Sequence, residues 1–505
     1  MWTEADQCHS EGFVDPCAVV IIGASGDLTG RKIIPALYHL YQNKRLPDNF
    51  FIVGCARSEL GNEGFRKKME EVALERSGDE GAEWQNFASL LHYVSIEYEG
   101  PESFKTLRQY LSGLEEIYHT HGNKIFYLAI PPSLYKPVAT NLGESGLAVE
   151  KAGENWCRII VEKPFGRDID SARDLDRAIH IHFKEHQVFR IDHYLAKETV
   201  QNILIFRFAN SIFEPVWNRN FIDHINIIAA ESLGVEHRAG YYEQAGVLRD
   251  MFQNHMMQLL AMTAMEPPSL FEADRVRDEK AKVYRSLRPF PVEKLEDYLL
   301  LGQYQEGIIK GHRARAYRDE PGINPDSVVP TFAMMKVFLD NWRWQGVPFY
   351  LTSGKRLLEK KTEISIQFKG IPHSMFRQSL GEHISANRLI LGIYPDEKIT
   401  LTFQTKNPGT RVCLRSVTMD FHYAMNYGGR QFDAYEKVLL DCMLGDQMLF
   451  WRQDGVELCW SFLTPIIREC ESCIERKQIL RPYKAGSWGP MEVNRILQQN
   501  NDLVS

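Results

Sequence analysis

The sequence predicts an α/β domain with a Rossmann-type, doubly wound parallel sheet, followed by an α+β domain with a large, mostly antiparallel sheet. Two observations favour this architecture. Short apolar runs alternate with helical patterns up to about residue 195, and beyond that point strand-like segments follow one another with few helices between them. We therefore expect a dinucleotide-binding domain at residues 1–196 and a second domain, for substrate binding and oligomerisation, at residues 197–505.

The first half contains five apolar runs typical of buried parallel strands. Such runs are uninterrupted because helices cover both faces of the sheet. The first run stops at Gly23, and a helical pattern follows from Leu28 to Tyr41, in which Pro35 should kink or loosen one turn. The five runs are Ala18–Ile22, Phe50–Val53, Lys124–Ile130, Arg158–Glu162 and Val188–Ile191.

The second half mixes two helical patterns with longer strand-like segments. Few helices separate these segments, which favours antiparallel pairing over parallel crossovers. The helical patterns are Glu198–Phe206 and Arg249–Met265, and the strand-like segments are Ala333–Leu339, Glu363–Phe368, Leu389–Tyr394 and Ile399–Phe403.

Composition and charge exclude several classes of protein. Hydrophobic residues make up 44% of the 505 residues, which is typical of globular proteins and argues against disorder or a fibre. The formal net charge of −7 argues against a nucleic-acid coat or a polybasic membrane binder. We see no signal peptide and no apolar run long enough to span a membrane, and the nine cysteines are scattered. We expect a cytoplasmic enzyme.

A glycine-containing loop between the first strand and the first helix indicates a dinucleotide site. It reads Gly23-Ala-Ser25-Gly26-Asp27-Leu28. Small residues let the backbone approach a pyrophosphate, and a helix N-terminus offers unpaired N–H groups. The loop departs from the usual G-x-G-x-x-G pattern, so an ordinary strand–helix turn remains the alternative at this point.

The end of the second strand favours NADP over NAD. An NAD site usually places an acidic residue there for the ribose hydroxyls. This chain has Arg57 and Ser58 instead, and a guanidinium pairs well with a 2′-phosphate. A solvated surface arginine is the alternative, and dual use of NAD and NADP stays open because arginine also stacks on adenine.

Polar side chains gather at the end of the run that finishes at Ile191. Asp192, His193, Tyr194 and Lys197 follow it within a few positions. Ligands of open α/β sheets bind beyond the carboxyl ends of the strands, and donors with positive charge suit a phosphate. A charged loop is the alternative for any one of these residues alone.

His255 is a candidate general base, because imidazole titrates near neutral pH and accepts a proton when hydride leaves a carbon that bears a hydroxyl. Asp250 lies five positions before it, about 140° away around an α-helix. We therefore expect its orienting carboxylate to come from elsewhere, with Asp192 as the candidate. The Cys470–Cys473 pair lacks companion ligands, so we expect no metal site.

These residues resemble the glucose-6-phosphate dehydrogenase family, whose members oxidise a sugar phosphate with a nicotinamide cofactor. The resemblance covers nearly the whole chain. Its motifs are Gly23–Leu28, Phe126–Pro132, Val161–Gly166, Arg190–Glu198, Phe208–Asn210, Trp217–Arg219, Arg249–His255, Gly346–Phe349 and Ser353–Lys355. It implies a Rossmann domain, a β+α domain, and a homodimer or homotetramer joined through the large sheet.

The resemblance also implies roles for individual residues. His255 matches the general base, and Asp192 matches the carboxylate that orients it. The other matched residues contact the ligands. The substrate set is Lys163, His193, Tyr194, Lys197, Glu231, Asp250, Lys355 and Lys360. The cofactor set is Gly23, Ser25, Gly26, Asp27, Leu28, Lys32, Arg57, Ser58, Tyr135 and Lys163.

The chain departs from the family pattern in the phosphate loop and in the second half. Ala196 replaces the usual glycine, which would strain the loop if that position needs a positive φ. Ser365 and Gly392 stand where some members have basic residues for a second, structural NADP, so we expect this chain to lack that site.

The reading that accounts for all these motifs is oxidation of β-D-glucose 6-phosphate at C1, with NADP as hydride acceptor and without a metal. We expect glucose 6-phosphate as the small-molecule substrate, and neither nucleic acid nor a membrane as a partner. Two alternatives remain. One is a catalytically silent NADP-binding regulator. The other is the same chemistry on another hexose phosphate, with dual use of NAD and NADP.

Overall fold

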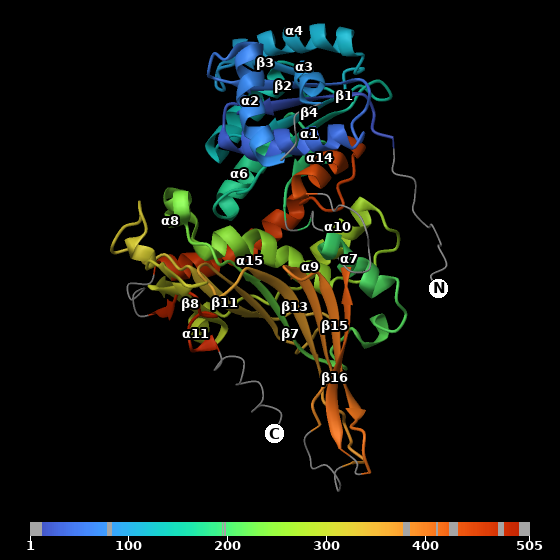
Figure 1. Ribbon diagram of the computed structural model, residues 1–505, viewed down its shortest axis with the longest axis vertical. Coiled ribbons are helices and arrows are strands. Elements are labelled where there is room, and N and C mark those ends of the chain that lie inside the picture. The colour runs from blue at the N-terminus through green and yellow to red at the C-terminus, as the bar shows by residue number, and fades with distance from the viewer. Residues whose placement is uncertain are drawn as a thin grey trace.

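Two sheets, one in each half of the chain, form the frame of the molecule, with a layer of helices between them (Figure 1). The computed structural model describes residues 13–77, 83–193, 195, 198–376, 384–410, 413–423, 433–472 and 479–493.

The N-terminal sheet has six parallel strands in the order β3-β2-β1-β4-β5-β6. The chain moves outward from β1 to β3 and then returns beside β1 at β4. This reversal opens a crevice at the carboxyl ends of the strands, where doubly wound sheets bind ligands. The strands are β1 (Cys17–Ile22), β2 (Phe50–Ala56), β3 (Leu91–Ser95), β4 (Lys124–Leu128), β5 (Cys157–Val161) and β6 (Val188–Arg190).

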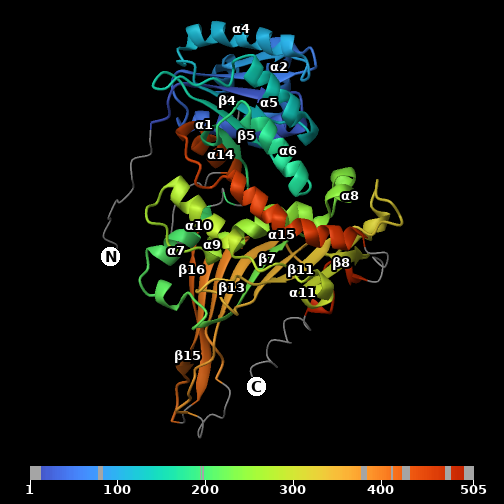
Figure 2. The ribbon, with the colours of Figure 1, turned by 180° about the vertical axis from the view of Figure 1, so that it is seen from behind.

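Helices cover both faces of this sheet, as the apolar runs predict. Val19 and Ile21 of β1 pack into one core, whereas Val20 and Ile22 pack into the other. Figures 1 and 2 show the two helical layers from opposite sides. One layer is α1 (Ile34–Gln42), α2 (Gly61–Ser77) and α3 (Trp84–Ser89), and the other is α4 (Pro101–Tyr118), α5 (Tyr135–Glu144) and α6 (Ile169–His180).

The first helical pattern is divided in the structure. A π-helical segment, η1 (Thr29–Ile33), precedes α1, and Pro35 lies in the first turn of α1. Because η1 runs directly into α1, Pro35 lacks an N–H that would bond back into the preceding turn, and the residues just before it are π-helical. The loosened turn expected around Pro35 is confirmed, and it lies directly after the glycine-containing loop.

The C-terminal sheet has nine strands in the order β16-β15-β14-β13-β7-β12-β11-β8-β17. The pairs β7–β12 and β8–β17 are parallel, and the other described pairs of this sheet are antiparallel, which confirms the predicted fold class. The strands are β7 (Ile222–Ala230), β8 (Leu299–Gln305), β11 (Phe332–Val337), β12 (Phe349–Gly354), β13 (Lys361–Phe368), β14 (Arg388–Tyr394), β15 (Lys398–Lys406), β16 (Leu414–His422) and β17 (Leu480–Lys484).

Helices pack on the side of the C-terminal sheet that faces the N-terminal domain (Figures 1 and 2). They share one hydrophobic core with β7 and β12–β14. The main ones are α7 (Glu198–Phe208), the π-helical segment η6 (Leu248–Met256), α9 (Met257–Ala264), α10 (Ala273–Arg285) and α15 (Gln453–Ser472). Smaller elements at the rim are α8 (Ala239–Val247), α11 (Leu295–Tyr298), β9 (Gly307–Ile309) and β10 (His312–Ala314).

A late segment of the chain returns to the N-terminal sheet. Helix α14 (Ala434–Leu444) packs against α1. Arg158 of β5 donates to the carbonyls of Cys442 and Met443 at 2.6 and 2.7 Å. A guanidinium there satisfies carbonyls that a helix leaves unpaired and complements its dipole. The N–H of Trp451 donates to the carbonyl of Arg190 at 3.0 Å, so the chain just before α15 is held at the end of β6.

Gly23 is a position where the fold requires glycine. Its φ is +98°, and a Cβ atom would lie 2.2 Å from the carbonyl oxygen of Ala129. We predict that Gly23→Ala destabilises the N-terminal domain by about 2 kcal/mol, because a left-handed backbone and a clash with main-chain atoms both oppose it. The midpoint of thermal unfolding, followed by circular dichroism, should fall.

Gly113 in α4 is the matched control, because nothing lies within 4 Å of the Cβ atom that alanine would add there. Gly113→Ala should raise the midpoint slightly, since alanine is the better helix former by about 1 kcal/mol. An equal midpoint for Gly23→Ala and the unmodified protein would show that the loop tolerates a side chain.

Candidate active site

A buried histidine–aspartate pair lies where the two sheets approach each other. Asp192 follows β6 directly, and His255 lies in η6. The Nδ1 of His255 is 2.7 Å from the Oδ1 of Asp192, and each residue is 3% exposed. A carboxylate that accepts from Nδ1 selects the tautomer in which Nε2 carries a free electron pair. The structure thus brings together the two residues that the sequence analysis paired.

Lys163 joins this pair from the loop after β5. Its Nζ lies 2.8 Å from the Nε2 of His255, 3.2 Å from the carbonyl oxygen of Asp250 and 3.3 Å from the Oδ1 of Asp250. The Lys163–Pro164 peptide is cis. A lysine ammonium has three donors and no acceptor, so it donates to Nε2. Nε2 of His255 is therefore an acceptor here.

The expectation that Asp250 and His255 do not share a face is wrong. It assumed α-helical geometry, in which residues five positions apart diverge. Residues 248–256 are π-helical, with i→i+5 hydrogen bonds, so residues five apart lie one above the other. Both therefore contact Lys163. Asp192 still provides a carboxylate within hydrogen-bond distance of Nδ1 of His255.

The charges around His255 favour its neutral form. Burial lowers the pKa of His255 below its ordinary value of 6.5, the Lys163 cation lowers it further, and Asp192 acts in the opposite direction. Burial would raise the pKa of Asp250, but Lys163 and Lys355 outweigh burial and hold that pKa below its usual range. A neutral imidazole beside an ionised carboxylate is suited to accepting a proton.

Asp250 extends the site to the edge of the C-terminal sheet. Its Oδ2 is 3.5 Å from the Nζ of Lys355, which is 2.5 Å from the Oε2 of Glu231. Glu231 follows β7 and Lys355 follows β12, and these two strands are parallel neighbours. Their carboxyl ends therefore present the two side chains side by side. Tyr241 donates to the Oδ1 of Asp250 at 3.5 Å. The row of carboxylates and ammonium groups is suited to hydroxyl groups of a sugar.

His193 faces a different set of partners. Its Nε2 is 3.1 Å from the Oε2 of Glu162, and its ring centroid lies 4.4 Å from that of Tyr435 in α14. Tyr194 and Lys197, which the sequence analysis grouped with His193 as phosphate ligands, lie outside the described residues, as does Ala196.

The glycine-containing loop lies at the mouth of the N-terminal sheet. Gly23 is buried and accepts from the hydroxyl of Thr29 at 3.3 Å, whereas Gly26 and Asp27 are exposed and Ser25 and Leu28 are partly exposed. The backbone carbonyl of Ser25 accepts from Lys68 at 2.7 Å. The exposed part of the loop directly precedes η1, as a dinucleotide site requires.

Other predicted cofactor residues lie around this loop. Lys32 is exposed, 3.9 Å from the carboxylate of Asp433 and over the ring of Tyr435. Exposed Arg57 has its guanidinium 5.6 Å from the ring centroid of Tyr98. Such a guanidinium is held near an aromatic ring yet is free to pair with an anion.

Three predicted site residues are positioned differently from the rest. Tyr135 is buried, and its hydroxyl donates to the carbonyl of Glu162 at 3.0 Å, so it holds the loop that carries Lys163. Ser58 accepts at its backbone carbonyl from the Tyr93 hydroxyl at 2.6 Å. Lys360 is exposed, and its ammonium lies 4.6 Å from the centroid of the Tyr394 ring.

Sequence reasoning missed two residues that touch the site. Glu162 accepts from Tyr127 at 2.6 Å and binds His193, and Tyr435 lies between His193 and Lys32. Glu162 could have been found from the sequence, since it is an acidic residue at the end of an apolar strand. Tyr435 carries none, because α14 is far away in the sequence.

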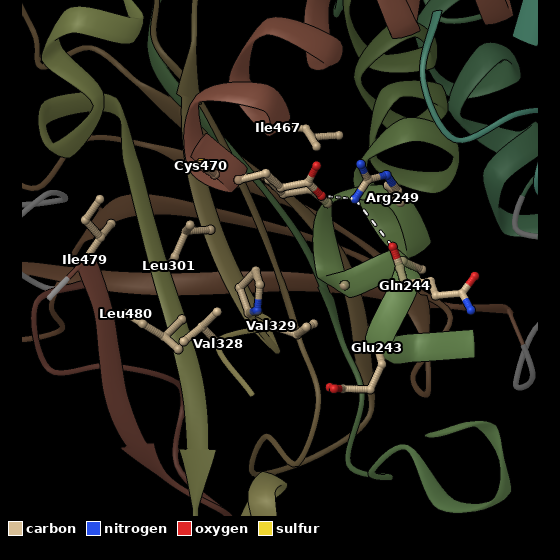
Figure 3. Close-up of a pocket in the computed structure, with 15 residues that line it drawn as sticks. Glu243, Gln244, Arg249, Leu301, Val328, Val329, Ile467, Cys470, Ile479 and Leu480 are labelled. Atoms are coloured by element: carbon tan, nitrogen blue, oxygen red, sulfur yellow. Dashed lines mark hydrogen bonds and ion pairs between the residues drawn. The ribbon is translucent and has the colours of Figure 1, made fainter. Parts of the chain in front are cut away.

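A separate pocket lies behind the start of η6 (Figure 3). Arg249 crosses it to Glu471 at 2.5 Å and to the carbonyl of Gln244 at 3.4 Å. Its cavity of about 140 Å³ is smaller than the roughly 300–1,000 Å³ of most ligand sites. The described residues that line it include none of the predicted site residues.

The described ranges contain no candidate metal cluster and no candidate membrane span. No group of three or more His, Cys, Asp or Glu side chains there is placed to hold a metal ion. None of the described helices is both long and apolar enough to cross a membrane.

Two family models match the chain almost end to end. The model described as "Glucose-6-phosphate dehydrogenase, NAD binding domain" matches residues 20–202, and "Glucose-6-phosphate dehydrogenase, C-terminal domain" matches residues 204–503.

Characterised relatives agree with these matches. The chain is 46% identical over 484 residues to the glucose-6-phosphate 1-dehydrogenase of Aggregatibacter actinomycetemcomitans, covering 96% of both chains. It is 40% identical over 479 residues to that of Bacillus subtilis, covering 95% of this chain and 96% of the other.

Solved structures show the same fold. A glucose-6-phosphate dehydrogenase in complex with its substrate glucose 6-phosphate superposes with a TM-score of 0.88 at 34% identity, covering 97% of this chain and 98% of that one. The glucose-6-phosphate 1-dehydrogenase of Mycobacterium avium gives a TM-score of 0.80 at 30% identity, covering 96% and 98%. The chain belongs to the glucose-6-phosphate dehydrogenase family.

Proposed function

We propose that this protein oxidises β-D-glucose 6-phosphate at C1 to 6-phospho-D-glucono-1,5-lactone, the first step of the oxidative pentose phosphate pathway. The observation that carries the proposal is the buried contact of 2.7 Å between His255 and Asp192, beyond the carboxyl ends of a doubly wound sheet. Family membership supports the substrate and the reaction.

In the proposed reaction His255 takes the proton of the C1 hydroxyl at Nε2 while the C1–H bond breaks with its electron pair and a C=O bond forms at C1. Asp192 holds the ring in the required tautomer and stabilises the imidazolium that forms. Lys163 donates to Nε2 in the structure, at 2.8 Å. A hydroxyl that enters between these two groups receives a hydrogen bond from the ammonium and gives its proton to the imidazole.

The remaining substrate contacts divide into two groups. Asp250, Lys355 and Glu231 form a continuous row of donors and acceptors at 2.5–3.5 Å, which supports a role in binding sugar hydroxyls. His193 lies 3.1 Å from Glu162, the residue before Lys163 in the chain, which supports a role at the phosphate together with Tyr194 and Lys197. Lys360 completes the proposed substrate set.

NADP is the cofactor that we propose. The residues fit a dinucleotide: a Cβ atom at Gly23 would clash with main chain, and the exposed turn at Gly26 leads into a helical segment. The loop residues, Lys32 and Lys163 would hold it, with Tyr135 positioning the loop that carries Lys163, and it would supply the hydride acceptor when bound. Exposed Arg57 supports recognition of the 2′-phosphate.

We also propose a domain boundary near residue 196, a cytoplasmic location and a homodimer or homotetramer formed through the large sheet. The partly exposed side chains of β15 and β16, with Met419 62% exposed, support an interface there.

The direct test follows the absorbance of reduced nicotinamide with purified protein. We expect reduction with glucose 6-phosphate and NADP, a lower kcat/KM with NAD, and very weak reduction with unphosphorylated glucose, because the phosphate-binding groups would lack a partner. Cofactor binding without any reduction would instead support a silent regulator, and a better hexose phosphate would correct the substrate.

His255→Asn should lower kcat by about 10²–10⁴-fold, the range of a lost general base, while glucose 6-phosphate binds within a few-fold of normal. In the unmodified protein kcat/KM should fall as pH drops through the pKa of His255, since protonation removes the base. Burial and Lys163 place that fall below pH 6.5. His186→Asn, an exposed histidine ion-paired to Glu150, is the control. Turnover of His255→Asn near that of the control would exclude His255 as the base.

Arg57→Gln should raise KM for NADP by about 10–100-fold, the effect of losing a hydrogen-bonded ion pair, and change KM for NAD by less than about 3-fold. Arg177→Gln, an exposed arginine on α6 that pairs with Asp174, controls for the loss of one surface charge. If Arg57→Gln weakens both cofactors equally, Arg57 does not read the 2′-phosphate.

A further inference from the structure

Lys280 is a buried lysine that the proposed reaction does not use. It lies on α10 and is 3% exposed. No described residue provides a hydrogen-bond partner for its Nζ. Lysines are almost never fully buried unless paired, because removing an ammonium group from water costs several kcal/mol. A site that retains such a group calls for a physical reason.

The face of α10 that carries Lys280 packs against residues next to the histidine–aspartate pair. Tyr284 lies four positions after Lys280 and so on the same face. Its ring stacks on Trp451, with centroids 5.6 Å apart and an interplanar angle of 21°. Its hydroxyl donates to Gln258 at 3.3 Å, and Gln258 is three positions after His255.

Trp451 connects this face to both members of the pair. Its backbone N–H donates to the carbonyl of Arg190 at 3.0 Å, two positions before Asp192. Its indole N–H donates to the side chain of Asn254, the residue before His255. The face of α10 that carries Tyr284 and Lys280 thus packs against chain neighbours of Asp192 and His255.

Lys280 and Asp192 interact through their charges. The pKa of Lys280 is lowered to about 7: burial lowers it most and Arg277 lowers it too, whereas Asp192 and then Cys459 raise it and Arg452 lowers it. Asp192 is thus a carboxylate that stabilises the protonated amine. The same carboxylate affects Tyr284. Burial and then Cys459 raise the pKa of the Tyr284 hydroxyl, and Asp192 raises it further.

The two arginines near Lys280 have carboxylate partners of their own. Arg452 pairs with Asp278 at 2.7 Å and with Asp454 at 2.8 Å. Arg277 pairs with Asp274 at 2.6 Å. Neither is therefore a substitute for Lys280 as the cation that faces Asp192.

We propose that Lys280 is a positioning residue for the proposed dehydrogenase reaction: its ammonium faces Asp192 from behind, holds that carboxylate ionised, and thereby sets the basicity of His255. The kinetic consequence of this proposal rests on the proposed function, whereas the contact between the two charges does not. A cation behind Asp192 reduces the attraction of the carboxylate for a proton on His255. It therefore keeps the imidazole neutral at mildly acidic pH and available as a base.

The kinetic test compares full-length variants over a range of pH, using glucose 6-phosphate and NADP. In Lys280→Met the acid limb of kcat/KM should move to higher pH by about one unit, the size expected for one charge removed at an effective dielectric constant of about 20. In Lys280→Arg it should stay at or below its normal position, because arginine keeps the charge. Lys282→Met, on the exposed side of the same helix, should leave it unchanged.

An acid limb of Lys280→Met within about 0.2 pH units of normal, in a folded and active protein, overturns the proposal. So does an upward shift in Lys280→Arg. A purely structural role would lower the rate at every pH without moving the limb.

A second measurement needs no activity. In protein labelled with ¹⁵N at lysine Nζ, the titration of Lys280 is followed by NMR and assigned by its loss in Lys280→Arg. Asp192→Asn should lower the pKa of Lys280 by about one unit, because the stabilising anion is removed. An unchanged titration overturns the charge contact. An inactive protein that passes this test would contradict the proposed function and leave the contact standing.

Discussion

The hydrogen bond between Nδ1 of His255 and the carboxylate of Asp192 joins the two halves of the chain at the place where the proposed chemistry occurs. Asp192 belongs to the end of the parallel sheet, and His255 to the helical layer over the antiparallel sheet. Both residues are buried, so removing one partner would leave an unpaired buried polar group that costs about 1–3 kcal/mol. The relative position of the two halves and the state of the base therefore depend on the same contact.

The π-helical segment is the second constraint on the site. It brings Asp250 and His255 to one side, so that Lys163 contacts both. Lys163 then links the imidazole to the row formed by Asp250, Lys355 and Glu231. In an α-helix the same residues would diverge by about 140°. Wide helical turns of this kind are frequent at functional sites because they place side chains that α-helices cannot.

The strands with continuous apolar runs in the first half, and β11, β13, β14 and β15 in the second, could be predicted from the sequence. The five runs of the first half correspond to β1, β2, β4, β5 and β6. Strand β3 was missed because two of its residues are partly exposed and one is exposed, which breaks the run. Strand β16 was missed because most of its side chains are exposed or partly exposed, and its pairing with β15 defines it instead.

The residues of the site also divide into those that could be predicted from the sequence and those that could not. Asp192 could be predicted because parallel strands present their ligands at their carboxyl ends, and the structure places it against His255. The contact of both Asp250 and His255 with Lys163 could not be predicted, because nothing local in the sequence signals a π-helix. The role of Tyr435 could not be predicted either, since α14 is brought to His193 by its packing against α1 and its contact with Arg158. These are tertiary effects, which local patterns do not encode.

The central claim is that C1 loses a hydride to the nicotinamide while His255 takes the hydroxyl proton. The most direct measurement uses glucose 6-phosphate carrying deuterium at C1, with mass spectrometry of the reduced cofactor after turnover in ordinary water. We predict one deuterium atom in each molecule of NADPH, because hydride passes directly between carbon atoms without exchange. Deuterium that appears in water rather than in NADPH would contradict the account.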